Sequence, residues 1–218
     1  MTHPTTARQI FQTAYESRYT WDENFPGYSA DVQLVQADEV HTGKIRINCD
    51  LSVEVTGVAD EQVEEGIYTQ LRDIVTHRKR TSFEESHEKH EFSFGQQDPD
   101  GAIEILVHGD SMGSNYKVRG KEICQVSRVL GRMAFIIDTY ENLDTGSGYL
   151  ATRYDAIFRN SRTNEVTSVL KFEDSYEKIG DYYVMSKQVV QEYKDGDRTI
   201  TEFGYFNIKL QRTSSCLA

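Results

Sequence analysis

A run of strict alternation between residues 45 and 55 constrains the fold of this chain more than any other feature. Apolar residues fill every odd position of the run and polar residues fill every even position; the apolar set is Ile45, Ile47, Cys49, Leu51, Val53 and Val55. Because successive side chains of a strand point to opposite faces, this pattern predicts one buried and one solvated face. The run is long enough for one long strand or for two strands joined by a bend.

Most of the remaining chain alternates in the same way. Short links rich in Gly and Asp separate the alternating segments, which is the pattern of consecutive antiparallel hairpins. No helical pattern that could serve as a parallel crossover follows Arg80. The sequence therefore predicts a mainly β (α+β) fold, with a large curved antiparallel sheet or half-open barrel of about nine to eleven strands.

Two segments have the periodicity of amphipathic helices instead. They span residues 6–18 and 60–77, and in each the apolar residues recur at spacings of three and four. That spacing leaves a single apolar stripe on each helix. A curved sheet needs a cover on its concave face, so we expect these two helices to cover it and to enclose an apolar cavity.

The chain shows no Pro- or Ser-rich linker and no shift in composition. We therefore expect a single domain over residues 1–210 and a frayed tail over residues 211–218. Its 24 Lys and Arg residues against 35 Asp and Glu residues give a formal net charge of -11. That charge repels phosphate backbones, so nucleic-acid binding is not expected. The basic cluster at residues 77–80 complements the dipole of the second helix, at its C-terminal end.

Other sequence features bear on cellular location. No apolar run approaches the roughly 18 residues that a membrane-spanning helix needs. The N-terminus lacks a basic region followed by an apolar one. Three widely spaced cysteines, Cys49, Cys124 and Cys216, do not suggest a disulfide framework. We therefore expect no membrane span and a cytoplasmic protein.

Each motif that could carry catalysis or a metal has a plainer interpretation. His87 and His90 could bind a metal from one helix face, but their segment leads into a strand, and we favour a solvated loop. Residues 109–113 match the G-x-S-x-G nucleophile motif, yet a strand and not a helix follows them. Asp98 and Asp100 fit a β-turn better than a calcium loop. We predict no catalytic residue, no metal and no cofactor, and an enzyme of unrecognised type stays open.

Aromatic and basic side chains are the candidates for ligand binding. Aromatic residues crowd the segment between the first helix and the first strand, and arginines lie within apolar strands further along the chain. Tyrosine offers an apolar body with a polar tip, and an inward arginine could pair with an anionic head group. The predicted ligand-binding residues are Tyr15, Tyr19, Trp21, Phe25, Tyr28, Arg128 and Arg153. The alternatives are core packing for the aromatic residues and structural pairing or solvent exposure for the arginines.

Three short stretches carry a resemblance to a known family. They are residues 19–28, with Trp21 and Phe25-Pro26-Gly27-Tyr28, then residues 123–128 and residues 172–176. In these stretches the chain resembles an uncharacterised family of cyanobacteria and plant plastids, known only as a domain of unknown function. The resemblance implies a photosynthetic source and a cytosolic or stromal setting, and it supplies no catalytic residues. The order of elements is also similar to the periplasmic lipoprotein-carrier fold, in which a half-barrel encloses an apolar cavity.

Three functions follow as hypotheses. The first is a non-enzymatic binding protein whose cavity holds a lipid, pigment or other hydrophobic small molecule. The second is a lipocalin-like protein that handles an open-chain tetrapyrrole (a bilin) or attaches it to another protein. The third is a regulatory protein that docks on a protein partner through its acidic surface.

Overall fold

The structure is a computed structural model that describes residues 5–109 and 114–212. Its helices are α1 (Ala7–Glu16), α2 (Glu61–Arg78) and α3 (Phe83–His87). Its strands are β1 (Tyr28–Gln36), β2 (Glu39–Ile47), β3 (Val53–Thr56), β4 (Glu91–Gln97), β5 (Ile103–His108), β6 (Asn115–Arg119), β7 (Glu122–Leu130), β8 (Met133–Asp144), β9 (Tyr149–Asn160), β10 (Val166–Ile179), β11 (Tyr182–Lys194) and β12 (Asp197–Leu210).

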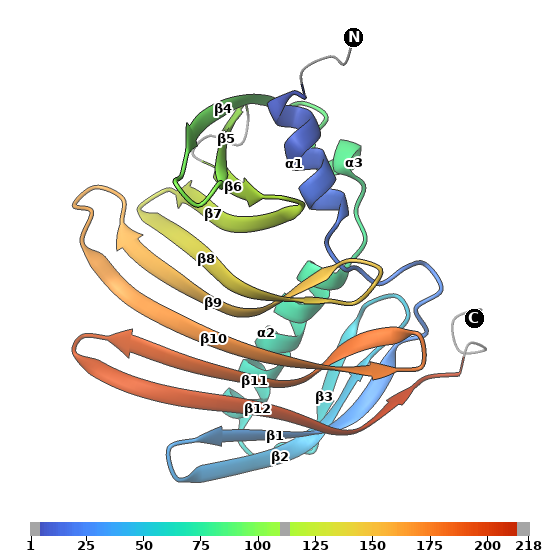
Figure 1. Cartoon of the computed structure of the whole chain (residues 1–218). Coiled ribbons are helices and arrows are strands. Elements are labelled where there is room, and N and C mark those ends of the chain that lie inside the picture. The colour runs from blue at the N-terminus through green and yellow to red at the C-terminus, as the bar shows by residue number, and fades with distance from the viewer. Residues whose placement is uncertain (1–4, 110–113, 213–218) are drawn as a thin grey trace. The chain divides into compact units, whose positions relative to one another are not determined.

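The strands form one antiparallel sheet of 12 strands (Figure 1). Its order is β3-β2-β1-β12-β11-β10-β9-β8-β7-β6-β5-β4, so β4 to β12 follow one another as hairpins and β1 pairs with the last strand. The predicted mainly β, antiparallel fold is confirmed. Because β3 and β4 end this order, they are its edge strands.

The alternating run of residues 45–55 forms two strands, the end of β2 and the start of β3. The sheet therefore has 12 strands, one more than the upper limit of the prediction. Ile47 ends β2, Val53 begins β3, and these two residues face each other in the hairpin. The turn between them puts Leu51 at a φ of 67° and closes with a 2.9 Å hydrogen bond from the Asn48 amide to the Ser52 carbonyl. Since the partners are both odd-numbered residues, the apolar face of the run is preserved across the turn.

The described chain divides into two compact units. Unit 1 comprises Met1–Tyr19, Thr81–Lys171 and Glu192–Arg198, and unit 2 comprises Thr20–Arg80, Phe172–Gln191 and Thr199–Ala218. Strands β10, β11 and β12 each contribute residues to both units. The predicted single domain over residues 1–210 stays a prediction.

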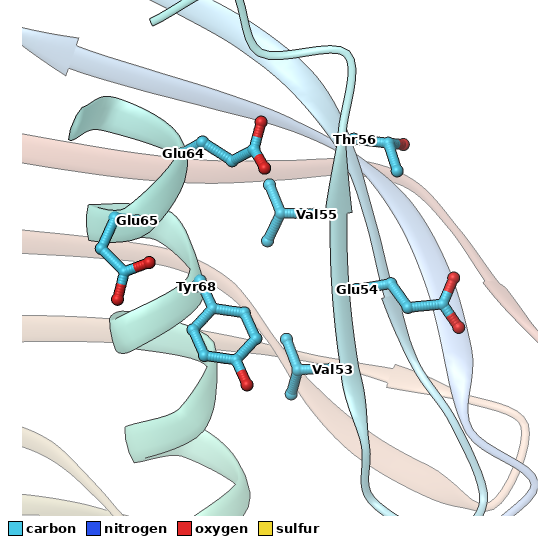
Figure 2. Close-up of a pocket in the computed structure, with 7 residues that line it drawn as sticks. All are labelled: Val53, Glu54, Val55, Thr56, Glu64, Glu65 and Tyr68. Atoms are coloured by element: carbon cyan, nitrogen blue, oxygen red, sulfur yellow. The ribbon is translucent and has the colours of Figure 1, made fainter. Parts of the chain in front are cut away.

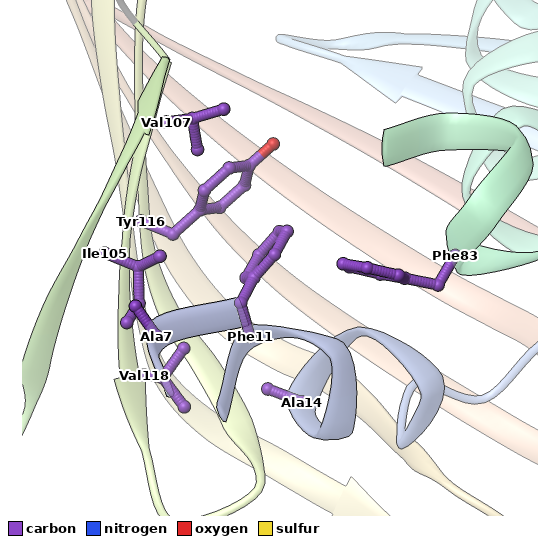
Figure 3. Packing of buried hydrophobic residues seen from close by; sticks show 8 residues of the cluster. All are labelled: Ala7, Phe11, Ala14, Phe83, Ile105, Val107, Tyr116 and Val118. Atoms are coloured by element: carbon purple, nitrogen blue, oxygen red, sulfur yellow. The ribbon is translucent and has the colours of Figure 1, made fainter. Parts of the chain in front are cut away.

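Helix α1 and the core of unit 1 form as the apolar stripe predicts. The Thr6 hydroxyl accepts a hydrogen bond from the Gln9 amide, and the Gln9 side chain accepts one from the Thr6 amide, which closes a capping box at the helix start. The buried cluster around α1 combines its inner face with residues of β5, β6 and α3 (Figure 3): Ala7, Phe11, Ala14, Phe83, Ile105, Val107, Tyr116 and Val118. Phe11 is fully buried in it.

Helix α2 belongs to unit 2. Its N-cap is Asp60, whose Oδ1 accepts hydrogen bonds of 2.8 and 3.0 Å from the amides of Gln62 and Val63. The helix buries the predicted stripe: Ile67, Leu71, Ile74 and Val75. Both predicted helices are therefore present, one in each unit. Over the described residues, no helix combines the length and apolar character that crossing a membrane requires.

Candidate functional site

An open groove lies between helix α2 and the edge strand β3 in unit 2 (Figure 2). Its volume is about 380 Å³, which lies within the range of roughly 300–1,000 Å³ typical of small-molecule sites. Val53 and Val55 project from β3 toward the helix, and Tyr68 projects from the helix toward the strand. These three side chains form an apolar wall that is open to solvent.

The groove exists because β3 is an edge strand. Val53 and Val55 continue the odd-numbered apolar face that also carries Ile45 and Ile47. Ile45 and Ile47 are 2% and 0% exposed, whereas both valines are only half-buried. On the helix, Tyr68 follows the buried Ile67 and keeps 37% of its surface exposed. The same alternation of apolar residues thus places buried core residues on β2 and leaves accessible apolar surface on β3.

Carboxylates complete the lining of the groove. Glu64 comes from the first turn of α2 and Glu65 follows it, and the Glu64 side chain extends toward Val55 (Figure 2). Glu54 and Thr56 lie on the opposite face of β3, where Glu54 Oε1 accepts a 2.8 Å hydrogen bond from the Asn48 side chain. An apolar wall with an acidic rim suits a ligand that has an apolar body and a positively charged or hydrogen-bond-donating group.

A buried polar network fixes α2 to the strands of unit 2. The Tyr205 hydroxyl donates to Gln70 Oε1, and Gln70 Nε2 donates to Gln188 Oε1 at 3.2 Å. Gln188 Nε2 in turn donates to Asp174 Oδ1 at 2.9 Å. Asp174 and Gln188 are 8% and 5% exposed, so each contact replaces one that the group would make with water. The network therefore holds one wall of the groove at a set position.

Arg78 and Tyr176 extend this network at the C-terminal end of α2. Arg78 Nη2 donates to the Tyr176 hydroxyl at 3.0 Å, and that hydroxyl donates to Asp174 Oδ2 at 3.4 Å. Burial raises the pKa of Tyr176 to about 12, and the Arg78 charge opposes that rise. Burial also raises the pKa of Tyr28, whose hydroxyl has no hydrogen-bond partner among the described residues. These phenols stay neutral at physiological pH.

Three of the predicted ligand-binding residues meet in unit 2. Trp21 stacks on Phe25 with ring centroids 4.1 Å apart, and Tyr28 packs edge-on against both rings. Trp21 Nε1 donates to the Tyr183 carbonyl at 3.1 Å. All three are at least 98% buried, which is the core-packing alternative. Their role in ligand binding stays a prediction.

The other four predicted residues lie in unit 1. Arg18 places its guanidinium 3.7 Å from the centroid of the Tyr15 ring, and the Tyr15 hydroxyl is 2.8 Å from Ser86 Oγ. Tyr19 is buried, and its amide donates to a backbone carbonyl of β9. Arg128 Nη2 donates to the Tyr116 hydroxyl at 3.1 Å. Arg153 forms an exposed 2.7 Å ion pair with Glu141, which is the structural pairing offered as its alternative.

The expected solvated loop is wrong at His87, whereas His90 lies between α3 and β4, outside any helix or strand. Residues 83–87 form α3, which a capping box between Ser82 and Glu85 begins, and His87 is 8% exposed. The Ser82-x-x-Glu85 spacing is a helix-start signal in the sequence that the strand prediction for residue 92 obscured. Among the residues that the structure describes, no group of three or more His, Cys, Asp or Glu side chains could hold a metal ion.

The remaining motifs fall in turns or outside the described residues. Asp98 accepts a backbone hydrogen bond of 2.9 Å from Gly101, as the predicted β-turn requires. The side chains of Asp98 and Asp100 pair with Lys117 and Arg119. Residues 110–113 of the G-x-S-x-G motif lie outside the described residues.

Comparisons with known proteins give a family and weak structural likenesses. A domain of an outer membrane lipoprotein-sorting protein from Vibrio parahaemolyticus is 10% identical with a TM-score of 0.38, over 94% of this chain and 92% of that one. A DUF1329 family protein from Desulfovibrio piger is 10% identical with a TM-score of 0.30, over 94% of this chain and 90% of that one. The MucA/MucB complex of Pseudomonas aeruginosa gives 9% identity and a TM-score of 0.24, over 94% and 99%.

These likenesses include the lipoprotein-carrier type that the order of elements suggested, but they are too weak to carry an argument about function. Comparison with curated proteins gives no match. The family assignment rests on firmer ground, because the family's model matches residues 2–211. The resemblance to a family of unknown function is thereby confirmed, and the chain belongs to the family described as protein of unknown function DUF3386.

Proposed function

We propose that this chain is a non-enzymatic binding protein that takes up a hydrophobic molecule in the groove between α2 and β3. The observation that carries the proposal is the solvent-open apolar wall of Val53, Val55 and Tyr68 in a groove of about 380 Å³.

The negative charge around the groove limits the class of ligand that can bind there. Glu64 and Glu65 stand at its helical side, and the whole chain carries a formal net charge of -11. A hydrophobic molecule that is neutral or positively charged is therefore favoured over an anionic one. A bilin, whose propionate groups are anionic, fits this groove less well. If no small molecule binds, the hypothesis that the acidic surface docks on a protein partner is favoured instead.

The first experiment is native mass spectrometry of the purified protein, followed by organic extraction of whatever co-purifies. A discrete hydrophobic molecule would name the ligand class directly. The second experiment titrates a neutral apolar fluorophore, N-phenyl-1-naphthylamine, into the wild-type protein and into two variants. Val55→Asp places a charge on the apolar wall, and Val40→Asp places the same charge at an exposed β2 position that is 56% accessible.

We expect Val55→Asp to weaken fluorophore binding at least tenfold and Val40→Asp to change it less than twofold. Circular dichroism and the melting temperature check that both variants fold. Tyr68→Ser is a second groove variant in case Val55→Asp disturbs the β2–β3 hairpin. Equal binding by the wild type and both groove variants would overturn the proposal, and so would a flat titration of the wild type.

A further inference from the structure

Arg18 and Arg128 are among the arginines of unit 1 that have no acidic partner within the described residues, although the chain carries 35 Asp and Glu residues. Within the described residues, neither Arg18 nor Arg128 makes an ion pair. Arg18 donates Nε to the Tyr15 carbonyl at 2.9 Å and lies over the ring of that tyrosine. Arg128 donates Nη2 to the Tyr116 hydroxyl at 3.1 Å. Each guanidinium is positioned by a tyrosine and keeps several N–H groups unused.

The two tyrosines belong to one aromatic cluster. The Phe11 ring lies 6.2 Å from the Tyr15 ring and 4.4 Å from the Tyr116 ring, between centroids. Figure 3 shows Tyr116 beside Phe11, with its hydroxyl directed away from strand β6. Tyr116 is 7% exposed. Since its hydroxyl oxygen accepts from Arg128, its proton is available to a further acceptor.

The pKa of His87 is sensitive to the positive charges beside this cluster. Its ring lies 5.1 Å from the rings of both Phe11 and Tyr15, and its Nδ1 is 3.0 Å from His90 Nδ1. Burial chiefly lowers the pKa of His87 to about 4, and the charges of His90, Arg18, Arg128 and Arg8 lower it further.

Arg8 differs from the other two arginines. It forms a 2.9 Å ion pair with Glu84, and its guanidinium lies 4.9 Å from the centroid of the Phe83 ring. Its charge is therefore largely balanced locally, whereas the charges of Arg18 and Arg128 are not. Of the three arginine charges that act on His87, those of Arg18 and Arg128 have no ion-pair partner among the described residues.

We propose that Arg18, Arg128 and the Tyr116 hydroxyl form a binding site for an oxyanion, a carboxylate or phosphate group, at the edge of the aromatic cluster of unit 1. Guanidinium groups match the planar, bidentate geometry of oxyanions. The Tyr15 ring beneath Arg18 restricts water on one side of that guanidinium, which strengthens the attraction. This site differs from the α2–β3 groove in its unit, its charge and its ligand.

The oxyanion could be free or could be the head group of an amphiphile. Isothermal titration calorimetry with sodium phosphate, sodium acetate and sodium decanoate separates these sources. Saturable binding of phosphate or acetate indicates a free anion. Decanoate binding at least tenfold tighter than acetate indicates an amphiphile whose chain lies on the aromatic cluster.

Matched variants assign the binding to this site. Arg18→Gln and Arg128→Gln each remove one guanidinium, and Arg119→Gln removes the guanidinium that is paired with Asp100 in the same unit. We expect each of the first two variants to weaken binding at least tenfold and Arg119→Gln to change it less than twofold. Val55→Asp, the groove variant, should leave binding of these anions unchanged, so this proposal and the proposed function can fail separately.

A second measurement does not depend on affinity alone. Bound anion should raise the pKa of His87, measured from its imidazole signals by NMR, because a negative charge stabilises the imidazolium. Arg18→Gln and Arg128→Gln should raise the same pKa in the absence of anion. The proposal is overturned if none of the three anions binds the wild type saturably, or if Arg18→Gln and Arg128→Gln both bind as tightly as Arg119→Gln.

Discussion

Lowering the pH from 7 to 4 should destabilise the fold through His87. Its pKa in the folded protein is about 4, against an ordinary value of 6.5, because burial and neighbouring positive charges penalise the imidazolium. The unfolded chain therefore binds this proton more readily than the folded protein does. The resulting stabilisation is fully present above pH 6.5 and is lost as the pH falls from 6.5 toward 4.

The magnitude follows from the two pKa values. The difference between 6.5 and about 4 corresponds to roughly 3 kcal/mol of unfolding free energy, at about 1.4 kcal/mol per pKa unit. His87 is 8% exposed, but its Nδ1 faces His90, which is only half-buried, so water screens part of the penalty. We expect about 2 kcal/mol after that screening.

Urea unfolding followed by far-ultraviolet circular dichroism tests this at pH 7, 6, 5 and 4.5. His87→Leu removes the titrating group, and His77→Gln removes a histidine whose side chain is 61% exposed. Carboxylates titrate in every variant, so the informative quantity is the difference between proteins. Between pH 7 and 4.5 the wild type and His77→Gln should both lose about 2 kcal/mol more than His87→Leu. An equal loss in His87→Leu and the wild type would refute the reasoning.

Four further substitutions test packing, backbone conformation and a buried hydroxyl, and urea unfolding measures each. Phe11→Ala should lower the free energy of unfolding by about 3–5 kcal/mol, because the ring is fully buried. Phe94→Ala should lower it by less than about 1 kcal/mol, because Phe94 is 49% exposed. Similar losses in the two variants would contradict this reasoning. Gly27→Ala should lower the free energy of unfolding by more than about 2 kcal/mol, since φ is +79° and the new Cβ would collide with the Ile47 carbonyl oxygen. An unchanged midpoint of urea unfolding would exclude that close contact. Tyr28→Phe should raise stability by up to about 1 kcal/mol, because it removes a buried hydroxyl that has no partner among the described residues; a clear loss would mean that the hydroxyl is satisfied in solution.

Periodicity in the sequence was sufficient to predict most of the elements. Alternation at residues 45–55 predicted which face of β2 and β3 is apolar, and it did so although the run contains a turn, because Ile47 and Val53 pair across it. Both long helices were predicted from their apolar stripes and caps within two residues at each end. These features depend on neighbours close in sequence, where backbone geometry alone sets the pattern.

The burial of each side chain and its contacts with other side chains depended on the tertiary structure. Val53 and Ile47 have the same place in the alternation, yet one lines an open groove and the other is in the core. The difference comes from the position of β3 at the sheet edge, which strand order decides and local periodicity does not. The candidate groove therefore could not be found from the sequence.

The arginine site shows the same limit over a longer distance. Arg128 was a predicted ligand-binding residue, whereas no sequence pattern singled out Arg18. Only the packing of Tyr15 and Tyr116 on Phe11 brings them to one aromatic cluster, across more than 100 positions of the chain. The sequence determined the strands, the helices and their apolar faces, because those follow from local spacing. The tertiary structure decided which apolar residues stay open and which charges lack a partner, because both depend on contacts between residues distant in the chain.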